Sequence, residues 1–555
     1  MCRIAPEAMN RFRNKTGVAS PSRRRFLVTL GAAVTLPCWL GRGAEPGVSA
    51  DELEKILAAL PQRAWSVPRK RRHLLIFERN VNYGGHRSIS TATTAFRLMG
   101  EKTGAFAVTS GSDPELFRAD NLQKFDGVFF NNNVGNLFTD ATLRENLAEF
   151  VYAGGGLMGV HGSTVAFTQW PGAIEDWPEF GLMIGARGAN HRENTERVVM
   201  KIEEPGHPLV RAFSGTHFEY RDEFFRVHEP YSRKRLRVLL SMDLERMPPA
   251  QGPAYGQVER ADRDYAVAWA RQYGRGRCFY CTIAHNPYVF WEPVLLSFYL
   301  AAAQFILGDL PAPVTPSARL TPAIRAFEKR GWRLGLRGGG EGSVFSALEK
   351  AERLGLLHVS VGTLQQVDSN KPDLFDARLA PELRRQVRFK TDATGVRLLA
   401  CEVPELPDNQ QSAEAIFGFA RKMGCELLAV PASKVRDLSV AGRCAHSHEV
   451  CLAVRPDSVR PLEQALALCR SAPPEVGVWW DGSYGLARKI SLSRAVEALR
   501  SRLLAVEFGS GQQAVECLNA LHAFKVQPLM LAASMNEATE KTIKACERVV
   551  TKWLP

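Results

Sequence analysis

The chain of 555 residues contains no apolar run long enough to cross a bilayer as a helix. The run from Val28 to Leu40, which follows a basic N-terminus, falls short of the roughly 20 residues that a spanning helix needs. We therefore expect no membrane span.

The chain is positively charged, but its basic residues do not form a pattern typical of nucleic-acid binding. The formal net charge is +13, and residues 1–50 hold eight Lys or Arg and two Glu, so the remainder carries about half of the excess. Beyond residue 50 no run of Lys and Arg with interleaved aromatic residues occurs, which argues against a nucleic-acid partner.

Residue spacings typical of a disulfide framework or of a local metal-binding motif are also missing. The eleven cysteines follow no disulfide framework, and no His-x-x-x-His pair occurs at the sites considered below. Cys278 and Cys281 have Cys-x-x-Cys spacing, but they lie within a strand-like run, where residues three apart face opposite sides. We interpret both as core residues.

The length indicates two domains rather than one core. The Pro-rich stretch Leu310–Pro316 cannot continue a helix or a central strand and marks the boundary. We therefore predict an N-terminal segment over residues 1–50, a first domain over 70–310, a linker over 311–325 and a second domain over 326–555.

Strands and helices alternate in the first domain. Short apolar runs predict strands at His73–Phe77, Phe106–Thr109, Phe125–Phe130 and Leu157–Val160, and helices over Ser90–Thr103 and from a Thr139 cap to Val151. This alternation predicts an α/β fold with a doubly wound sheet, in which ligands bind at the carboxyl ends of the strands.

His161 lies in a Gly-flanked turn directly after the last of these strands. Small residues on both sides let the backbone turn sharply, as in a nucleophile elbow, but with an imidazole where Ser or Cys would attack. We expect His161 on an exposed turn. An ordinary Gly-rich turn with an incidental His is the alternative.

Further polar residues follow the predicted strands and loops. The candidate catalytic residues are His161, Asp222, Glu223 and His285, and the candidate substrate-binding residues are His86, Arg87, Trp170 and His191. Imidazole and carboxylate groups can act as general acid and base. They can also hold zinc or manganese, for which His161, His285 and Asp222 are the candidate ligands.

The second domain shows eight short strands with helices between them. They are expected near 333–336, 357–361, 396–401, 426–430, 449–454, 476–480, 503–508 and 527–531. This count fits a (β/α)8 TIM barrel, with an open α/β sheet as the alternative. Glu402, Asp481 and Glu507 stand at strand ends, where three carboxylates could hold magnesium weakly.

The N-terminus resembles a twin-arginine export signal. Ser22-Arg-Arg-Arg-Phe-Leu27 precedes the short apolar run, and Val48-Ser-Ala50 offers a small-residue cleavage site. The resemblance implies transport by the twin-arginine translocase and a periplasmic or secreted location. An unprocessed basic tail is the alternative.

The first domain resembles the trehalose-utilisation (ThuA-like) family over roughly residues 70–310. The resemblance rests on an ordered set of motifs: Gly154–Thr164, His191, His207-Pro208, Asp222-Glu223, Val267-Ala-Trp269, Tyr273–Tyr280 and His285. It implies a class I glutamine amidotransferase-like fold and a role in carbohydrate metabolism. Because His161 stands at the elbow in place of a cysteine, thiol amidotransfer is excluded here.

The second domain resembles the xylose-isomerase-like sugar phosphate isomerase/epimerase barrels, through Val476–Tyr484 and Leu503–Glu507. That family holds a divalent metal on Glu, Asp and His ligands. Here Asp481 matches the aspartate, but Tyr484 and Glu507 stand where histidines are expected. We interpret the barrel as degenerate, retained for binding or as a scaffold.

These observations favour an exported carbohydrate-metabolism protein whose first domain acts on a sugar or keto-sugar by acid-base or metal-assisted chemistry, as a glycoside-processing hydrolase or lyase. A non-catalytic periplasmic sugar-binding or scaffold protein is the first alternative. A metal-dependent isomerase or epimerase in the barrel is the second, and it requires Glu402, Asp481 and Glu507 to converge.

Overall fold

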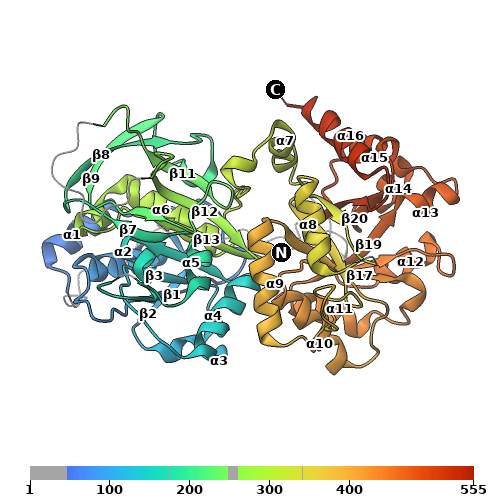
Figure 1. Cartoon of the computed structure of the whole chain (residues 1–555), viewed down its shortest axis with the longest axis horizontal. Helices are drawn as coiled ribbons and strands as arrows, with labels where there is room; N and C mark the ends of the chain where they lie inside the picture. The colour runs from blue at the N-terminus through green and yellow to red at the C-terminus, as the bar shows by residue number, and fades with distance from the viewer. Residues whose placement is uncertain (1–46, 173, 248–259, 341, 555) are drawn as a thin grey trace, which may run out of the picture.

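A nine-stranded mixed sheet forms the core of the first domain in the computed structural model, which describes residues 47–172, 174–247, 260–340 and 342–554 (Figure 1). The strands, in spatial order, are β2 (Ala107–Gly111), β1 (His73–Phe77), β3 (Gly127–Asn131), β4 (Gly156–Val160), β13 (Gly276–Cys281), β12 (Ala266–Tyr273), β11 (Arg237–Met242), β8 (Glu196–Ile202) and β9 (His217–Asp222).

Strand direction changes across this sheet. From β2 to β13 neighbouring strands are parallel, whereas each pair from β13 to β9 is antiparallel. Four successive reversals give β9 the same direction as β4 and β13, so the carboxyl ends of these three strands share one edge. The sequence predicted the parallel half and did not predict the antiparallel half.

Helices cover both faces of the sheet. They are α1 (Ala50–Ala59), α2 (Ser88–Thr103), α3 (Ala119–Leu122), α4 (Ala141–Tyr152), α5 (Pro178–Ile184) and α6 (Pro293–Ile306). Apolar side chains of α1, α2 and α6 form one core with the sheet, and those of α4 and α5 form a second core on the other face. Two small pairs, β5 (Thr168–Gln169) with β6 (Ile174–Glu175) and β7 (Arg187–Asn190) with β10 (Arg226–His228), lie outside the sheet.

Successive side chains of a strand point to opposite faces of the sheet, so each strand contributes to both cores. Leu74 and Ile76 of β1 belong to the first, while Leu75 and Phe77 belong to the second. Cys278 and Cys281 of β13 are both buried and likewise divide between the two cores. Their prediction as core residues is confirmed.

The chain around the expected cleavage site is part of the folded domain. Ser49 caps α1 by accepting a hydrogen bond from the Glu52 amide at 3.2 Å, and Glu52 accepts one from the Ser49 amide at 2.9 Å. Val48 is buried beside them. The twin-arginine motif itself lies outside the described residues.

The second domain is a closed barrel of eight parallel strands, as predicted. The strands are β14 (Leu334–Arg337), β15 (His358–Gly362), β16 (Arg397–Glu402), β17 (Leu427–Pro431), β18 (Cys451–Arg455), β19 (Val476–Asp481), β20 (Leu503–Phe508) and β21 (Met530–Ser534). The helices that accompany them are α7 (Pro322–Arg330), α8 (Val344–Arg353), α9 (Pro381–Thr394), α10 (Gln410–Lys422), α11 (Ser439–Ser447), α12 (Leu462–Arg470), α13 (Gly482–Ala487), α14 (Leu492–Leu499), α15 (Gly511–Phe524) and α16 (Thr539–Thr551).

Helix boundaries follow local chemistry. Gly104, Gly331 and Gly395 end α2, α7 and α9 in the left-handed conformation that glycine adopts without steric cost. Asp140, rather than the predicted Thr139, caps α4, because its carboxylate accepts the amide of Thr142 at 2.7 Å.

The two domains lie side by side (Figure 1), and residues at the amino ends of strands from both domains meet at the interface. Arg275, next to the first residue of β13, donates to the Glu449 carbonyl, next to β18 in the barrel, at 2.8 Å. Arg397 at the start of β16 donates back to the Gly274 carbonyl at 2.8 Å. The carboxyl edges of the sheet and of the barrel therefore point away from each other.

The predicted linker is ordered along the first domain. The Ser317 amide donates to the Leu236 carbonyl at 2.8 Å, and Arg237 donates to the Thr315 carbonyl at 3.0 Å. Within the described ranges no helix is both long enough and apolar enough to cross a membrane.

Candidate metal centre in the sheet domain

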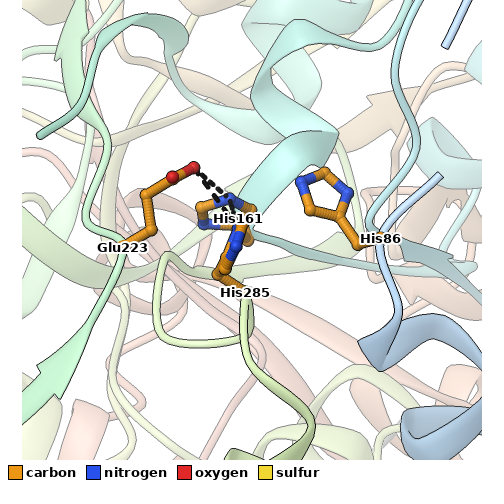
Figure 2. Close-up of side chains that lie close together, drawn as sticks. All are labelled: His86, His161, Glu223 and His285. Carbon is orange, nitrogen blue, oxygen red and sulfur yellow. Dashed lines mark hydrogen bonds and ion pairs between the residues drawn. The ribbon is translucent and has the colours of Figure 1, made fainter. Parts of the chain in front are cut away.

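Four side chains converge at the carboxyl edge of the sheet. His86, His161, Glu223 and His285 each offer one potential ligand atom, and these atoms all lie within 4.8 Å of one another (Figure 2). Of the residues that the structure describes, they form the one such group of three or more His, Cys, Asp or Glu.

The topology explains why residues so distant in sequence meet. His161 follows β4, Glu223 follows β9 and His285 follows β13 by a short turn, and these strands end at the same edge. His86 comes from the loop between β1 and α2. The spacing of 199 residues between His86 and His285 carries no local signal that predicts the contact.

His161 is fully buried, which corrects the expectation of an exposed turn. Its backbone has a φ of 41°, and a Cβ at the following Gly162 would lie 3.2 Å from the His86 ring. Glycine at this position thus lets two imidazoles approach each other. The elbow directs its side chain into the domain rather than toward solvent.

Hydrogen bonding sets the tautomer of His161. Its Nδ1 lies 3.1 Å from the Thr282 carbonyl oxygen, which can only accept, so Nδ1 carries the proton. The lone pair on Nε2 then faces a Glu223 oxygen at 3.2 Å and Nδ1 of His285 at 3.3 Å. Nε2 of His161 and the Glu223 oxygen are thus two acceptors that face each other, and a cation between them would stabilise the pair.

Glu223 is the carboxylate at the centre of the group. One oxygen lies 3.2 Å from His161 and 3.3 Å from His285, and the other lies 3.2 Å from Nδ1 of His191. Burial alone would raise its pKa, but the contacts with His161 and His285 hold the pKa well below the usual range. Glu223 is therefore an anion, as a metal ligand must be.

His86 completes the group as a neutral imidazole. Burial, together with the neighbouring His161 and His285, lowers its pKa to about 2. Nε2 lies 3.3 Å from the Tyr83 hydroxyl, while Nδ1 is buried with no hydrogen-bond partner among the described residues. A buried ring nitrogen without a partner is costly unless a cation engages it, which fits a metal at this position.

Asp222 lies beside the group rather than within it. Its oxygens accept the backbone amides of His285 and Asn286, each at 3.1 Å, and the Asn286 side-chain amide at 2.7 Å. Burial raises its pKa to about 7. The carboxylate therefore orients the His285 loop and is not free to bind substrate.

Of the remaining predicted residues, two lie at the rim of the four-residue group and one lies away from it. His191 contacts Glu223 and is partly exposed, and Trp170 packs against Tyr83 with ring centroids 5.9 Å apart. Arg87 instead lies 3.3 Å from Glu52 of α1, with a largely exposed side chain. Tyr83, which the sequence did not indicate as a site residue, contacts His86.

The barrel mouth holds the three carboxylates considered as weak metal ligands. They do converge, but around guanidinium groups: Arg455 lies 2.8 Å from Glu402, 3.2 Å from Glu507 and 3.6 Å from Asp481. Arg337 contacts Glu402 at 2.8 Å and Glu507 at 3.3 Å. Two arginines thus occupy the place that a divalent cation would need.

Asp481 has a further, structural role at the barrel mouth. Its carboxylate caps α13 by accepting the amides of Ser483 at 2.8 Å and Tyr484 at 3.3 Å. This capping leaves it poorly placed as a metal ligand.

The chain thus joins a mixed α/β sheet domain, which carries the candidate metal centre, to a closed barrel of eight parallel strands. Residues 73–306 match the family model described as trehalose utilisation (ThuA). The comparison with curated proteins found no match.

Solved structures resemble each part. A ThuA-like protein from Bacteroides uniformis is 17% identical, with 43% of this chain and 93% of that chain covered and a TM-score of 0.36. A sugar phosphate isomerase/epimerase from Parabacteroides distasonis is 8% identical, covering 37% and 86%, with a TM-score of 0.28. A xylose isomerase domain protein from Planctomyces limnophilus is 14% identical, covering 40% and 96%, with a TM-score of 0.29.

Proposed function

We propose that the sheet domain is a metal-dependent enzyme that acts on a sugar or keto-sugar. The observation that carries this proposal is the convergence of His86, His161, Glu223 and His285, with ligand atoms within 4.8 Å of one another. The match of residues 73–306 to the trehalose-utilisation family supports a carbohydrate substrate.

Three imidazoles and one carboxylate suit zinc or manganese better than magnesium, which prefers oxygen ligands. When bound, such a metal supplies Lewis acidity toward a hydroxyl or carbonyl oxygen of the sugar. The Thr282 carbonyl fixes the His161 tautomer, and Asp222 fixes the loop that carries His285.

The chain itself supplies binding and proton transfer. His191 lies at the rim, in contact with Glu223 and partly exposed, where it can exchange a proton with a substrate hydroxyl. Tyr83 and Trp170 form an aromatic wall next to His86 that suits the apolar face of a sugar ring.

The reaction class follows from the number of available carboxylates. Retaining glycosidases use two carboxyl groups about 5 Å apart. Here Glu223 faces the group, while Asp222 is held by backbone amides. The geometry therefore favours metal-assisted elimination, isomerisation or hydrolysis over a two-carboxylate mechanism.

Metal content tests this proposal. We expect wild-type protein to bind zinc or manganese stoichiometrically, and His161→Ala and His285→Ala to weaken that binding by about tenfold or more. His217→Ala is the matched control, because His217 pairs with Asp243 outside the group. Mass spectrometry of metal content, followed by activity on sugars and keto-sugars after chelation and metal return, provides the readout.

Two outcomes contradict the proposal. One is wild-type protein that takes up neither metal in stoichiometric amount. The other is metal lost from Asp481→Asn but retained by His161→Ala, which places the centre in the barrel instead.

A sugar-binding or scaffold role is the second candidate, and the barrel mouth favours it. Arg337 and Arg455 neutralise Glu402 and Glu507 there, which leaves carboxylates and guanidiniums that can hydrogen-bond hydroxyl groups without chemistry. Metal-free wild-type protein that still binds sugars would support this candidate.

A further inference from the structure

A large cleft lies between the two domains, on the side of the sheet domain opposite to the metal centre. Its volume is about 1670 Å³, and it lies between the amino ends of the sheet strands and those of the barrel strands. Sixteen Lys and Arg residues line it against seven Asp and Glu residues. The excess positive charge of the described chain is therefore concentrated in this cleft.

Two arginines on the sheet side lack acidic partners. Arg275 is almost fully buried and donates to the carbonyls of Cys425 and Glu449, at 3.5 and 2.8 Å. Arg277 donates to the carbonyls of Phe305, at 2.9 Å, and of Gly154, at 3.3 Å. Within the described ranges, neither guanidinium has a carboxylate oxygen within 4 Å, whereas Arg72 nearby is paired with Asp309.

The barrel side adds more positive than negative charge. Glu426 is shared by Arg333 at 2.8 Å and Arg397 at 3.0 Å. Glu449 lies 3.4 Å from Arg421 and 3.9 Å from Lys70 of the sheet domain. Each carboxylate therefore faces at least two cations before Arg275 and Arg277 are considered.

This imbalance has an energetic consequence. Burial, reinforced by the nearby Arg72 and Arg275, lowers the pKa of Arg277 to about 10. Burial likewise lowers the pKa of Arg275. Like charges held together in a partly desolvated cleft repel one another, and a bound anion would relieve that repulsion.

We propose that this interdomain cleft binds a small molecule that carries a phosphate group. Phosphate suits several converging guanidiniums, because its oxygens accept charge-assisted hydrogen bonds from more than one of them. Arg275 and Arg277 come from the sheet domain and Arg421 from the barrel, so the ligand would contact both domains. The site is independent of the metal centre and of the proposed reaction.

Binding across the interface stabilises the folded chain by mass action. We therefore expect inorganic phosphate or glucose 6-phosphate to raise the thermal unfolding temperature of the full-length protein saturably. Potassium chloride at matched ionic strength and glucose should not do so. Calorimetry with the same compounds gives the dissociation constants. Tighter binding of glucose 6-phosphate than of inorganic phosphate would identify a sugar phosphate as the ligand.

Variants locate the site. Arg277→Gln should weaken phosphate binding by about tenfold or more, and Arg421→Gln should weaken it several-fold. Arg421 is partly exposed, so its variant keeps the test valid if Arg277→Gln does not fold. Arg378→Gln is the control, because Arg378 is exposed and pairs with Asp376 outside the cleft lining.

Two results would overturn the proposal. One is wild-type protein that shows no saturable binding beyond the chloride control. The other is phosphate binding by both cleft variants that is as tight as that of wild type.

Discussion

His161 illustrates how a single residue takes its role from its neighbours. Its chemistry depends on the Thr282 carbonyl, which assigns the proton to Nδ1, and on Glu223, which faces Nε2. The sequence identified His161, Glu223 and His285 as candidate site residues. It assigned His86 to substrate binding, whereas the structure places that ring among the potential metal ligands.

His207 is a second buried histidine with a defined tautomer. Its Nε2 donates to the Pro313 carbonyl at 2.9 Å, and its Nδ1 accepts the Leu209 amide at 3.3 Å. Burial, with Arg237 and Arg211 nearby opposing Glu204, lowers its pKa to about 4. Protonation would break the bond from Leu209.

The stability of the protein should therefore fall in mild acid through His207. In the unfolded chain His207 takes up a proton near pH 6.5. In the folded protein its pKa is about 4, so the ring stays neutral until the pH falls to that range. Its contribution is thus lost progressively between these pH values, by at most about 3 kcal/mol. Urea unfolding from pH 7.5 to 4 should show a shallower pH dependence for His207→Asn than for wild type.

His446→Asn is the matched control, because His446 is exposed on the surface of the barrel. An unchanged pH slope in His207→Asn would show that the folded protein does not exclude the proton from this ring.

At the scale of elements, close packing between β4 and α6 holds His161 in position. A Cβ at Gly156, the first residue of β4, would lie 2.5 Å from the carbonyl oxygen of Ile306, the last residue of α6. That oxygen belongs to the backbone and cannot rotate away. Glycine is thus required where the helix crosses the strand that leads to the metal centre.

Gly156→Ala should destabilise the protein by about 1–3 kcal/mol, because the added methyl group forces β4 and α6 apart. Equilibrium unfolding in urea measures the loss. Gly84→Ala is the matched control, since a Cβ there meets no atom within 4 Å. Equal stability of both variants would mean that β4 and α6 can separate at little cost.

Prediction of the elements followed the strength of the local pattern. Parallel strands such as β1 and the barrel strands are buried on both faces, so they appear as short apolar runs and were predicted within a few residues. Strands β8 and β9 carry polar residues on one face, and their pairing depends on contacts distant in sequence. The antiparallel half of the sheet was therefore missed.

At the scale of the whole molecule, the two domains are joined through charged contacts at the amino edges of their strands. Arg388 of α9 reaches across to Glu145, at 2.8 Å, and to Glu179, at 2.6 Å. The carboxyl edges face opposite ways, so the metal centre and the barrel mouth open to different sides. No intermediate could pass directly between them through the interface.

Export also belongs to this scale, because the twin-arginine route carries folded proteins. We propose that the chain is exported after folding to the periplasm, on the basis of the motif at 22–27. The Arg23→Lys, Arg24→Lys double variant should remain in the cytoplasm with its metal bound, as cell fractionation and metal analysis would measure.

Arg25→Lys, outside the twin pair, should be exported as wild type is. Periplasmic accumulation of the double variant would exclude this route.

The two-domain order, the parallel strands, the barrel and most of the candidate site residues follow from the amino-acid sequence, because apolar runs, glycine turns and strand-end polar residues are local features. Which of these residues meet depends on the folded arrangement. It placed His86 beside His161, turned His161 inward, assigned Asp222 to the loop of His285 and set arginines among the barrel carboxylates. Each of these depends on strand order and on contacts far apart in the chain, which no local pattern records.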